Sequence, residues 1–185
     1  DLVRYLVGDF DSLQGHLETF VPERPVAKGS SETGRVTVDD VAWIQARMTN
    51  GAIGSIEASR FATGTLDDLR IWVYGDKGAF HFDLMDPSFL YYFDESNPGG
   101  DYGGSRGWQR LETVSYYPEA KTPPSRAPIG WVRSHAENQY QFLKAVAEGR
   151  DPSPGFVDGL KTQLVIDAAE RSASTGGSWT SVEQE

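Results

Sequence analysis

One stretch decides the fold, Val36-Thr-Val-Asp-Asp-Val-Ala-Trp-Ile-Gln-Ala-Arg-Met-Thr-Asn-Gly-Ala-Ile-Gly-Ser-Ile-Glu-Ala-Ser59. Apolar and polar residues alternate on both sides of Asn50-Gly51, as they do in half-buried strands. Asn-Gly between two alternating runs is the strongest short-range signal for a β-hairpin, because both residues tolerate the positive φ of a tight primed turn. The sequence therefore predicts a hairpin of two strands, at residues 40–49 and 52–62.

Similar runs lie on both sides of this hairpin, and several are joined by short turns such as Asp76-Lys77. Short turns leave no room for crossover helices, so the strands are expected to pair antiparallel. Residues 27–37, rich in Gly, Ser and Thr, are expected to form a polar loop. The further strands are expected at residues 15–21, 68–75, 78–84, 89–93 and 108–114.

The last third of the chain predicts helices. Apolar residues recur at helical spacing over 133–148 and over 156–174, and glycines follow both segments. Residues 179–182 are expected to add a short edge strand. Strands followed by two helices indicate an α+β domain, with a large open, mostly antiparallel sheet and helices packed on one face.

Composition excludes several classes of protein. The chain has 185 residues, enough for one domain, and a net charge of −10, which argues against a nucleic-acid surface. It has no cysteine, so disulfides and thiolate metal sites are excluded and a cytoplasmic protein is expected. No apolar run reaches the length of a membrane span. The three histidines, His16, His81 and His135, lack metal-ligand spacing, and no metal site is expected.

The opening, Asp1-Leu-Val-Arg-Tyr-Leu-Val-Gly8, has the pattern of the middle or end of an amphipathic helix that stops at Gly8. The chain is therefore expected to be a fragment of a longer protein. Adjacent carboxylates such as Asp39 and Asp40 point to opposite faces of a strand, so they are not expected to share a proton as a hydrolytic dyad does.

A few polar residues are candidates for ligand binding. Arg60, late in the second hairpin strand, either binds a substrate oxygen or carboxylate or reaches solvent at the end of the sheet. Thr63, Thr65 and Asp67 belong to a short polar loop, which either contacts a ligand or is an ordinary turn. His135, near the start of the first long helix, either lines a pocket or packs half exposed.

The order of these segments resembles the C-terminal domain of the Gfo/Idh/MocA family of oxidoreductases. The opening helix is similar to the one that follows the family's Gly-x-His-x-x-Asp motif, with Asp1 as its final residue. The hairpin around Asn50-Gly51 and the next one, Leu69 to Phe80 with its Gly-x-x-Gly turn, are similar to the family's central strands. Residues 142–154 and 158–172 resemble its closing helix pair. The likeness covers nearly the whole chain.

The resemblance implies a parent enzyme with an N-terminal Rossmann domain, absent from residues 1–185, that binds NAD or NADP. It implies hydride transfer between nicotinamide and a sugar, polyol or related hydroxyl compound. The family's catalytic Asp and His precede residue 1, so no catalytic or cofactor-binding residue is expected here and the fragment is expected to be inactive. The loop from Thr63 to Asp67 matches the place of substrate contacts, with Arg60 and His135 beside it.

The resemblance also implies a homo-oligomer formed through the exposed face of the sheet, where Trp43 and Trp72 are expected to lie uncovered. Two alternatives remain open at this point. The first is a non-catalytic binding or scaffold protein of the same architecture. The second is a relative that cleaves glycosides through a transient redox step.

Overall fold

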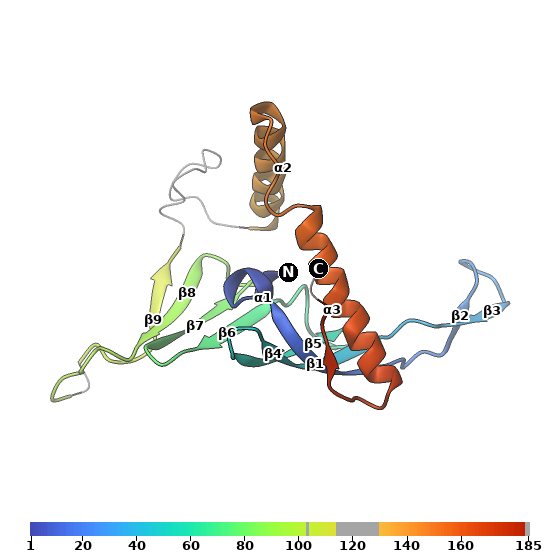
Figure 1. Cartoon of the computed structure of the whole chain (residues 1–185), viewed down its shortest axis with the longest axis horizontal. Helices are drawn as coiled ribbons and strands as arrows, with labels where there is room; N and C mark the ends of the chain where they lie inside the picture. Colours follow the sequence, from blue (N-terminus) through green and yellow to red (C-terminus); the bar gives the residue numbers. More distant parts are fainter. Residues whose placement is uncertain (103, 114–129, 184–185) are drawn as a thin grey trace. The chain divides into compact units, whose positions relative to one another are not determined.

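The structure is a computed structural model that describes residues 1–102, 104–113 and 130–183 (Figure 1). The chain divides into two compact units. Unit 1 is Asp1–Thr63 with Ser153–Glu185, and unit 2 is Gly64–Pro152.

Unit 1 is built on a four-stranded antiparallel sheet in the order β10-β1-β4-β5. The long helix α3 lies along one face of this sheet, and the short α1 precedes its first strand (Figure 1). A separate two-stranded ribbon, β2 with β3, leaves the sheet between β1 and β4. The elements are α1 (Leu2–Leu6), β1 (Phe10–Glu18), β2 (Glu23–Pro25), β3 (Thr33–Arg35), β4 (Val41–Met48), β5 (Ile53–Ser59), α3 (Phe156–Ser174) and β10 (Thr180–Ser181).

The hairpin predicted around Asn50-Gly51 is the β4–β5 pair, with Arg47 opposite Ile53. The Gly51 N–H donates to the Met48 carbonyl at 2.9 Å, and Gly51 has a φ of 88°. The Met48 N–H in turn donates to the Ala52 carbonyl at 2.8 Å. This is the pattern of a three-residue loop with a glycine bulge, and not of a two-residue primed turn. Gly51 is needed because the position is left-handed.

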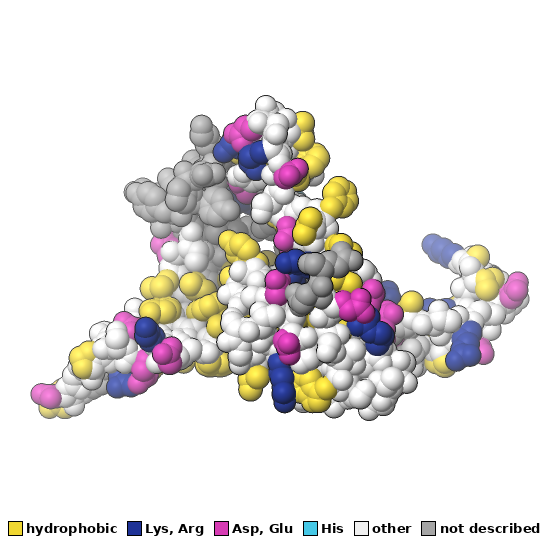
Figure 2. All heavy atoms as spheres, in the orientation of Figure 1, with side chains coloured by type: hydrophobic (Ala, Val, Ile, Leu, Met, Phe, Trp, Pro, Cys, Tyr) yellow, Lys and Arg dark blue, Asp and Glu magenta, His cyan; other side chains and the backbone are white. Residues whose placement is uncertain are grey.

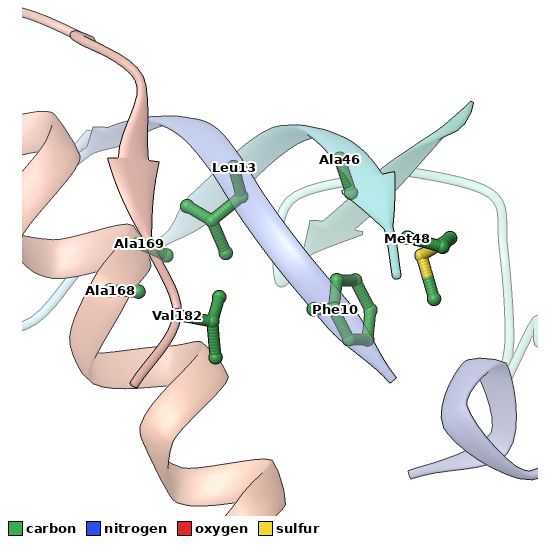
Figure 3. Close-up of a cluster of buried hydrophobic side chains, with 7 residues drawn as sticks. All are labelled: Phe10, Leu13, Ala46, Met48, Ala168, Ala169 and Val182. Atoms are coloured by element: carbon green, nitrogen blue, oxygen red, sulfur yellow. The ribbon is translucent and has the colours of Figure 1, made fainter. Parts of the chain in front are cut away.

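The core of unit 1 lies between the sheet and α3 (Figure 3). Its centre is Leu13 of β1, which is fully buried. The sheet approaches the helix so closely here that a Cβ on Gly15 would lie 2.8 Å from the Ala169 carbonyl oxygen. The Gly15 N–H donates to Ser172 Oγ at 2.8 Å, and that hydroxyl donates to the Ser178 carbonyl at 2.6 Å. The core residues are Phe10, Leu13, Ala46, Met48, Ala168, Ala169 and Val182.

The residues that alternate with these core positions form the other face of the sheet. Trp43 is 43% exposed and stacks on His16 across the β1–β4 pair, with ring centroids 5.7 Å apart. Ile53, on β5, is more exposed still, at 82%. The expected exposed tryptophan on the sheet is therefore present in this unit.

Unit 2 contains a second antiparallel sheet in the order β6-β7-β8-β9 and the helix α2. One face carries a row of rings on directly opposed residues, in which Trp72 stacks on His81 at 3.7 Å and His81 on Tyr91 at 5.4 Å between centroids. Trp72 is 51% exposed. The elements are β6 (Arg70–Tyr74), β7 (Gly78–Asp83), β8 (Phe89–Asp94), β9 (Gln109–Glu112) and α2 (Trp131–Glu148).

The predicted α+β class with antiparallel sheets and helices is confirmed. The described strands lie in three sheets, where the sequence led us to expect one broad sheet, because β5 pairs only with β4 and β6 only with β7. The segment 27–37, expected to be a loop, contains β3, whose three residues pair with β2. None of the helices in the described part of the chain is long and apolar enough to cross a membrane.

Candidate functional site

The connection from β5 to β6 carries four of the five candidate residues. Arg60 and Thr63 belong to unit 1, and Thr65 and Asp67 begin unit 2. All four are exposed. Because connections between strands are where a rigid scaffold presents ligand-binding groups, this segment is a candidate for ligand contact.

Backbone hydrogen bonds shape this connection. The Arg60 N–H donates to the Asp40 carbonyl at 2.9 Å, which fixes the start of the segment to β4. The Thr63 N–H donates to the Phe61 carbonyl at 2.8 Å, and the Leu69 N–H to the Asp67 carbonyl at 3.1 Å. These bonds span only two residues each, so the segment is a series of tight turns and not an extended strand.

Three of its polar side chains are free to bind a ligand. Arg60, Thr63 and Asp67 make no side-chain hydrogen bond or ion pair with any other residue that the structure describes. Arg60 and Thr63 in unit 1 offer a planar cationic donor and a hydroxyl, and Asp67 in unit 2 offers an acceptor carboxylate. Vicinal hydroxyl groups of a polyol are matched by such a mixture of donors and acceptors, whereas an apolar ligand would leave these groups unpaired.

His135, the fifth candidate, is the fifth residue of α2 and lies in unit 2. It is exposed, and the helix begins at Trp131 after Gly130 in extended conformation. The structure thus places four candidates on one connection and His135 on a separate helix.

Asp40, just before β4, was not singled out from the sequence. Its side chain is only 1% exposed, and Oδ2 accepts hydrogen bonds from the N–H groups of Phe20 at 2.9 Å and Val21 at 3.1 Å. Arg24 Nη2 lies 3.5 Å from Oδ1. A buried carboxylate held in this way fixes the backbone where β1 leads into the ribbon. In the sequence it looks the same as the exposed Asp39 beside it.

A second polar cluster joins α1, the connection from α1 to β1, and α3. Asp9 Oδ1 accepts from Arg4 Nε at 2.9 Å, and Asp9 Oδ2 accepts from Lys161 Nζ at 3.2 Å. These hydrogen bonds, with the one from Lys161 foremost, hold the pKa of the Asp9 carboxyl below its usual value. Arg4 also donates to the Asp158 carbonyl at 3.2 Å. The cluster fixes α1 against the start of α3 and has a structural role.

The described residues contain neither the strand–helix unit typical of dinucleotide sites nor a group of metal ligands. Every strand pair is antiparallel, so no βαβ unit is present among them to present a helix N-terminus to a pyrophosphate. The sequence has no Gly-x-Gly-x-x-Gly segment. In the same described part of the chain, no three His, Cys, Asp or Glu side chains are grouped to hold a metal.

Comparison with known proteins relates this geometry to a family. Residues 1–81 match the model of the GFO/IDH/MocA C-terminal domain. Levoglucosan dehydrogenase of Pseudarthrobacter phenanthrenivorans is 32% identical over 199 aligned residues, which cover 100% of this chain and 49% of that enzyme. The chain therefore spans about half the length of the curated relative that it matches.

Solved structures give the same picture. Levoglucosan dehydrogenase in complex with NADH and levoglucosan is 33% identical with a TM-score of 0.87, over 100% of this chain and 48% of that one. An oxidoreductase domain protein from Kribbella flavida is 33% identical with a TM-score of 0.83, at the same coverage. Both similarities extend over both units of this chain.

Proposed function

We propose that this chain, whose residues 1–81 match the GFO/IDH/MocA C-terminal domain, is the C-terminal, substrate-side domain of an NAD(H)-dependent oxidoreductase of that family. The full-length enzyme would act on a sugar, polyol or related hydroxyl compound. One observation carries the proposal: the entire chain aligns with levoglucosan dehydrogenase, an enzyme solved with NADH and with levoglucosan or L-sorbose.

The cofactor, in this proposal, is bound by a Rossmann domain outside residues 1–185, and the antiparallel pairing of the described strands supports this, because a Rossmann domain is built on parallel strands. The nicotinamide supplies the hydride acceptor or donor. The part of this chain is to bind and orient the substrate. Arg60 and Asp67 hydrogen-bond its hydroxyl groups, and Thr63 and Thr65 add hydroxyl contacts from the same connection. His135 is proposed to contact the substrate from α2.

The test is oxidation by the full-length protein, with NAD and with NADP, of a panel that includes levoglucosan, L-sorbose, inositols, aldoses and linear polyols. We expect turnover of at least one carbohydrate with NAD, and none by residues 1–185 alone. Absence of nicotinamide-dependent turnover across the panel, with carbohydrate binding retained, would instead support the non-catalytic binding protein. Release of an aglycone from glycosides without net NADH formation would support the redox-dependent glycosidase.

Two variants test the proposed substrate residues. Arg60→Ala removes a cationic donor and is expected to raise KM about tenfold, because substrate and transition state both lose the contact. Thr63→Val is expected to raise KM a few-fold. Thr37→Val is the matched control, since Thr37 is also exposed and lies outside the β5–β6 connection. Equal KM values for all three variants and the parent would remove this connection from the substrate site.

We also propose that the uncovered sheet faces pair with a second copy of the chain. The support is the exposure of Trp43 on one sheet and Trp72 on the other, since large exposed aromatic residues on a sheet are typical of interfaces. Light scattering should find an oligomer, and Trp43→Ser or Trp72→Ser should reduce its mass. A strict monomer at high concentration would contradict the proposal.

A further inference from the structure

The ribbon between β1 and β4, residues 22–36, is a distinct feature of unit 1 that we call the arm. It leaves the sheet as two short strands, β2 and β3, joined by residues 26–32 (Figure 1). Each strand has only three residues and pairs with nothing else among the described residues. The function proposed above makes no use of the arm.

The base of the arm is firmly held. The Asp40 carboxylate accepts from the N–H groups of Phe20 and Val21, and the Val36 N–H donates to the Pro22 carbonyl at 2.8 Å. Thr19 Oγ1 donates to the Val38 carbonyl at 3.0 Å. A buried carboxylate with two backbone donors tolerates little change of backbone direction. The arm therefore leaves the sheet in a fixed direction, as a preformed binding element would.

Beyond the ion pair of Arg24 with Asp40, the outer part of the arm is largely exposed. All three residues of β2 are exposed, and Val26 beyond it is 57% exposed, with its side chain beside Gly34. An isolated two-stranded ribbon is marginally stable in water. An arm with a fixed base and an exposed outer end has side chains available for contact with another surface.

The charge of the arm indicates which kind of surface it contacts. The arm has three basic residues, Arg24, Lys28 and Arg35, against two acidic ones, while the chain as a whole has a net charge of −10. Figure 2 shows dark blue Lys and Arg side chains along it. Lys28 and Arg35 have no ion-pair partner among the described residues. A locally basic arm on an acidic protein is complementary to another molecule of the same protein.

We propose that the arm binds a second copy of this chain, with Lys28 and Arg35 facing acidic side chains of the partner and Val26 buried at the contact. This contact is separate from the pairing of sheet faces and does not depend on enzymatic activity. Nucleic acid is a poor occupant, because the negative charge of the whole chain opposes it.

The test measures the oligomer mass and dissociation constant of the full-length protein by sedimentation and light scattering. The double substitution Lys28→Glu with Arg35→Glu should raise the dissociation constant of the oligomer at least about tenfold. Salt at about 0.5 M should also raise the dissociation constant of the parent protein, because it screens the ion pairs. Lys77→Glu is the control, because it reverses the charge of an exposed lysine outside the arm, in the turn between β6 and β7. It should leave the dissociation constant unchanged.

A second variant removes the arm and keeps its base. Glu23 is the register partner of Arg35, so Arg24–Gly34 is replaced by Asn-Gly to close a two-residue hairpin. With circular dichroism unchanged, we expect a smaller oligomer. The same mass and dissociation constant as the parent in both arm variants would overturn the proposal. A parent protein that is monomeric at every concentration would also overturn it. So would arm variants that lose binding to a different protein while their own oligomer is unchanged.

Discussion

The close approach of Gly15 in β1 to Ala169 in α3 allows a test of how the helix packs on the sheet. Gly15→Ala places a methyl group 2.8 Å from the Ala169 carbonyl oxygen and 3.2 Å from its Cα, where an ordinary contact is 3.4–4 Å. These are backbone atoms in the middle of α3, so no side chain is able to rotate away. The helix has to move by several tenths of an ångström, which also stretches the hydrogen bond from the Gly15 N–H to Ser172.

The matched control is Gly54→Ala. Gly54 lies in β5 of the same sheet, and an added Cβ there would meet nothing within 4 Å. Both substitutions restrict the unfolded chain equally, a gain of about 0.4–1 kcal/mol. The difference between the two variants therefore measures the clash alone. Overpacking of this kind costs about 1–3 kcal/mol, so Gly15→Ala should be less stable than Gly54→Ala by that amount.

The assay is thermal unfolding of the two variants and the parent, followed by far-ultraviolet circular dichroism and by tryptophan fluorescence. For a chain of this length, 1 kcal/mol shifts the melting temperature by about 2–4 °C, so the two variants should differ by roughly 2–12 °C. If Gly15→Ala melts within about 1 °C of Gly54→Ala, α3 does not lie against β1 as the structure has it.

Three further predictions concern stability. Leu13→Ala should cost about 3 kcal/mol in urea unfolding because Leu13 is fully buried, while Leu66→Ala, 77% exposed, should stay within about 0.5 kcal/mol of the parent. Asp40→Ala should cost about 2–4 kcal/mol by leaving two backbone N–H groups without their acceptor, and an unchanged midpoint would contradict that role. The pKa of Asp9 is lowered in the folded state, first by Lys161, so its contribution is present above the unfolded pKa of about 3.9 and is lost as pH falls through the lower folded value. Asp9→Asn should therefore lower the free energy of unfolding by about 1 kcal/mol at pH 7, a value reduced for partial exposure. The difference between variant and parent should disappear below about pH 4. A difference that does not depend on pH would refute this.

The hairpin at Asn50-Gly51 was predictable because its information is local. The alternation of apolar and polar residues indicates the two strands, and glycine adopts the left-handed conformation at position 51 without steric strain. The turn type was not predictable, since it depends on which residues pair across the strands, here Arg47 with Ile53. Similarly, β3 is hidden in a run of Gly, Ser and Thr, whose pairing with β2 leaves no pattern in the sequence.

The candidate site shows the same limit. Strand boundaries and resemblance were enough to place Arg60, Thr63, Thr65 and Asp67 on one connection. Which polar groups are already satisfied depends on contacts between distant residues. Asp39 and Asp40 are identical neighbours in the sequence, yet only Asp40 is buried, because the backbone of residues 20–21 folds back over it. Burial of that kind is a tertiary property.

Unit 1 is discontinuous along the chain, and this has a consequence for its synthesis. The strands β1, β4 and β5 are complete at Ser59, but the helix that covers them begins only at Phe156. At ribosomal rates of about 5–20 residues per second, residues 60–155 take on the order of 5–20 s to emerge. During that interval the apolar side of the nascent sheet lacks α3, its main native cover. We therefore expect Phe10, Leu13 and Met48 to be available to chaperones, or to transient packing within the incomplete polypeptide, until α3 is made.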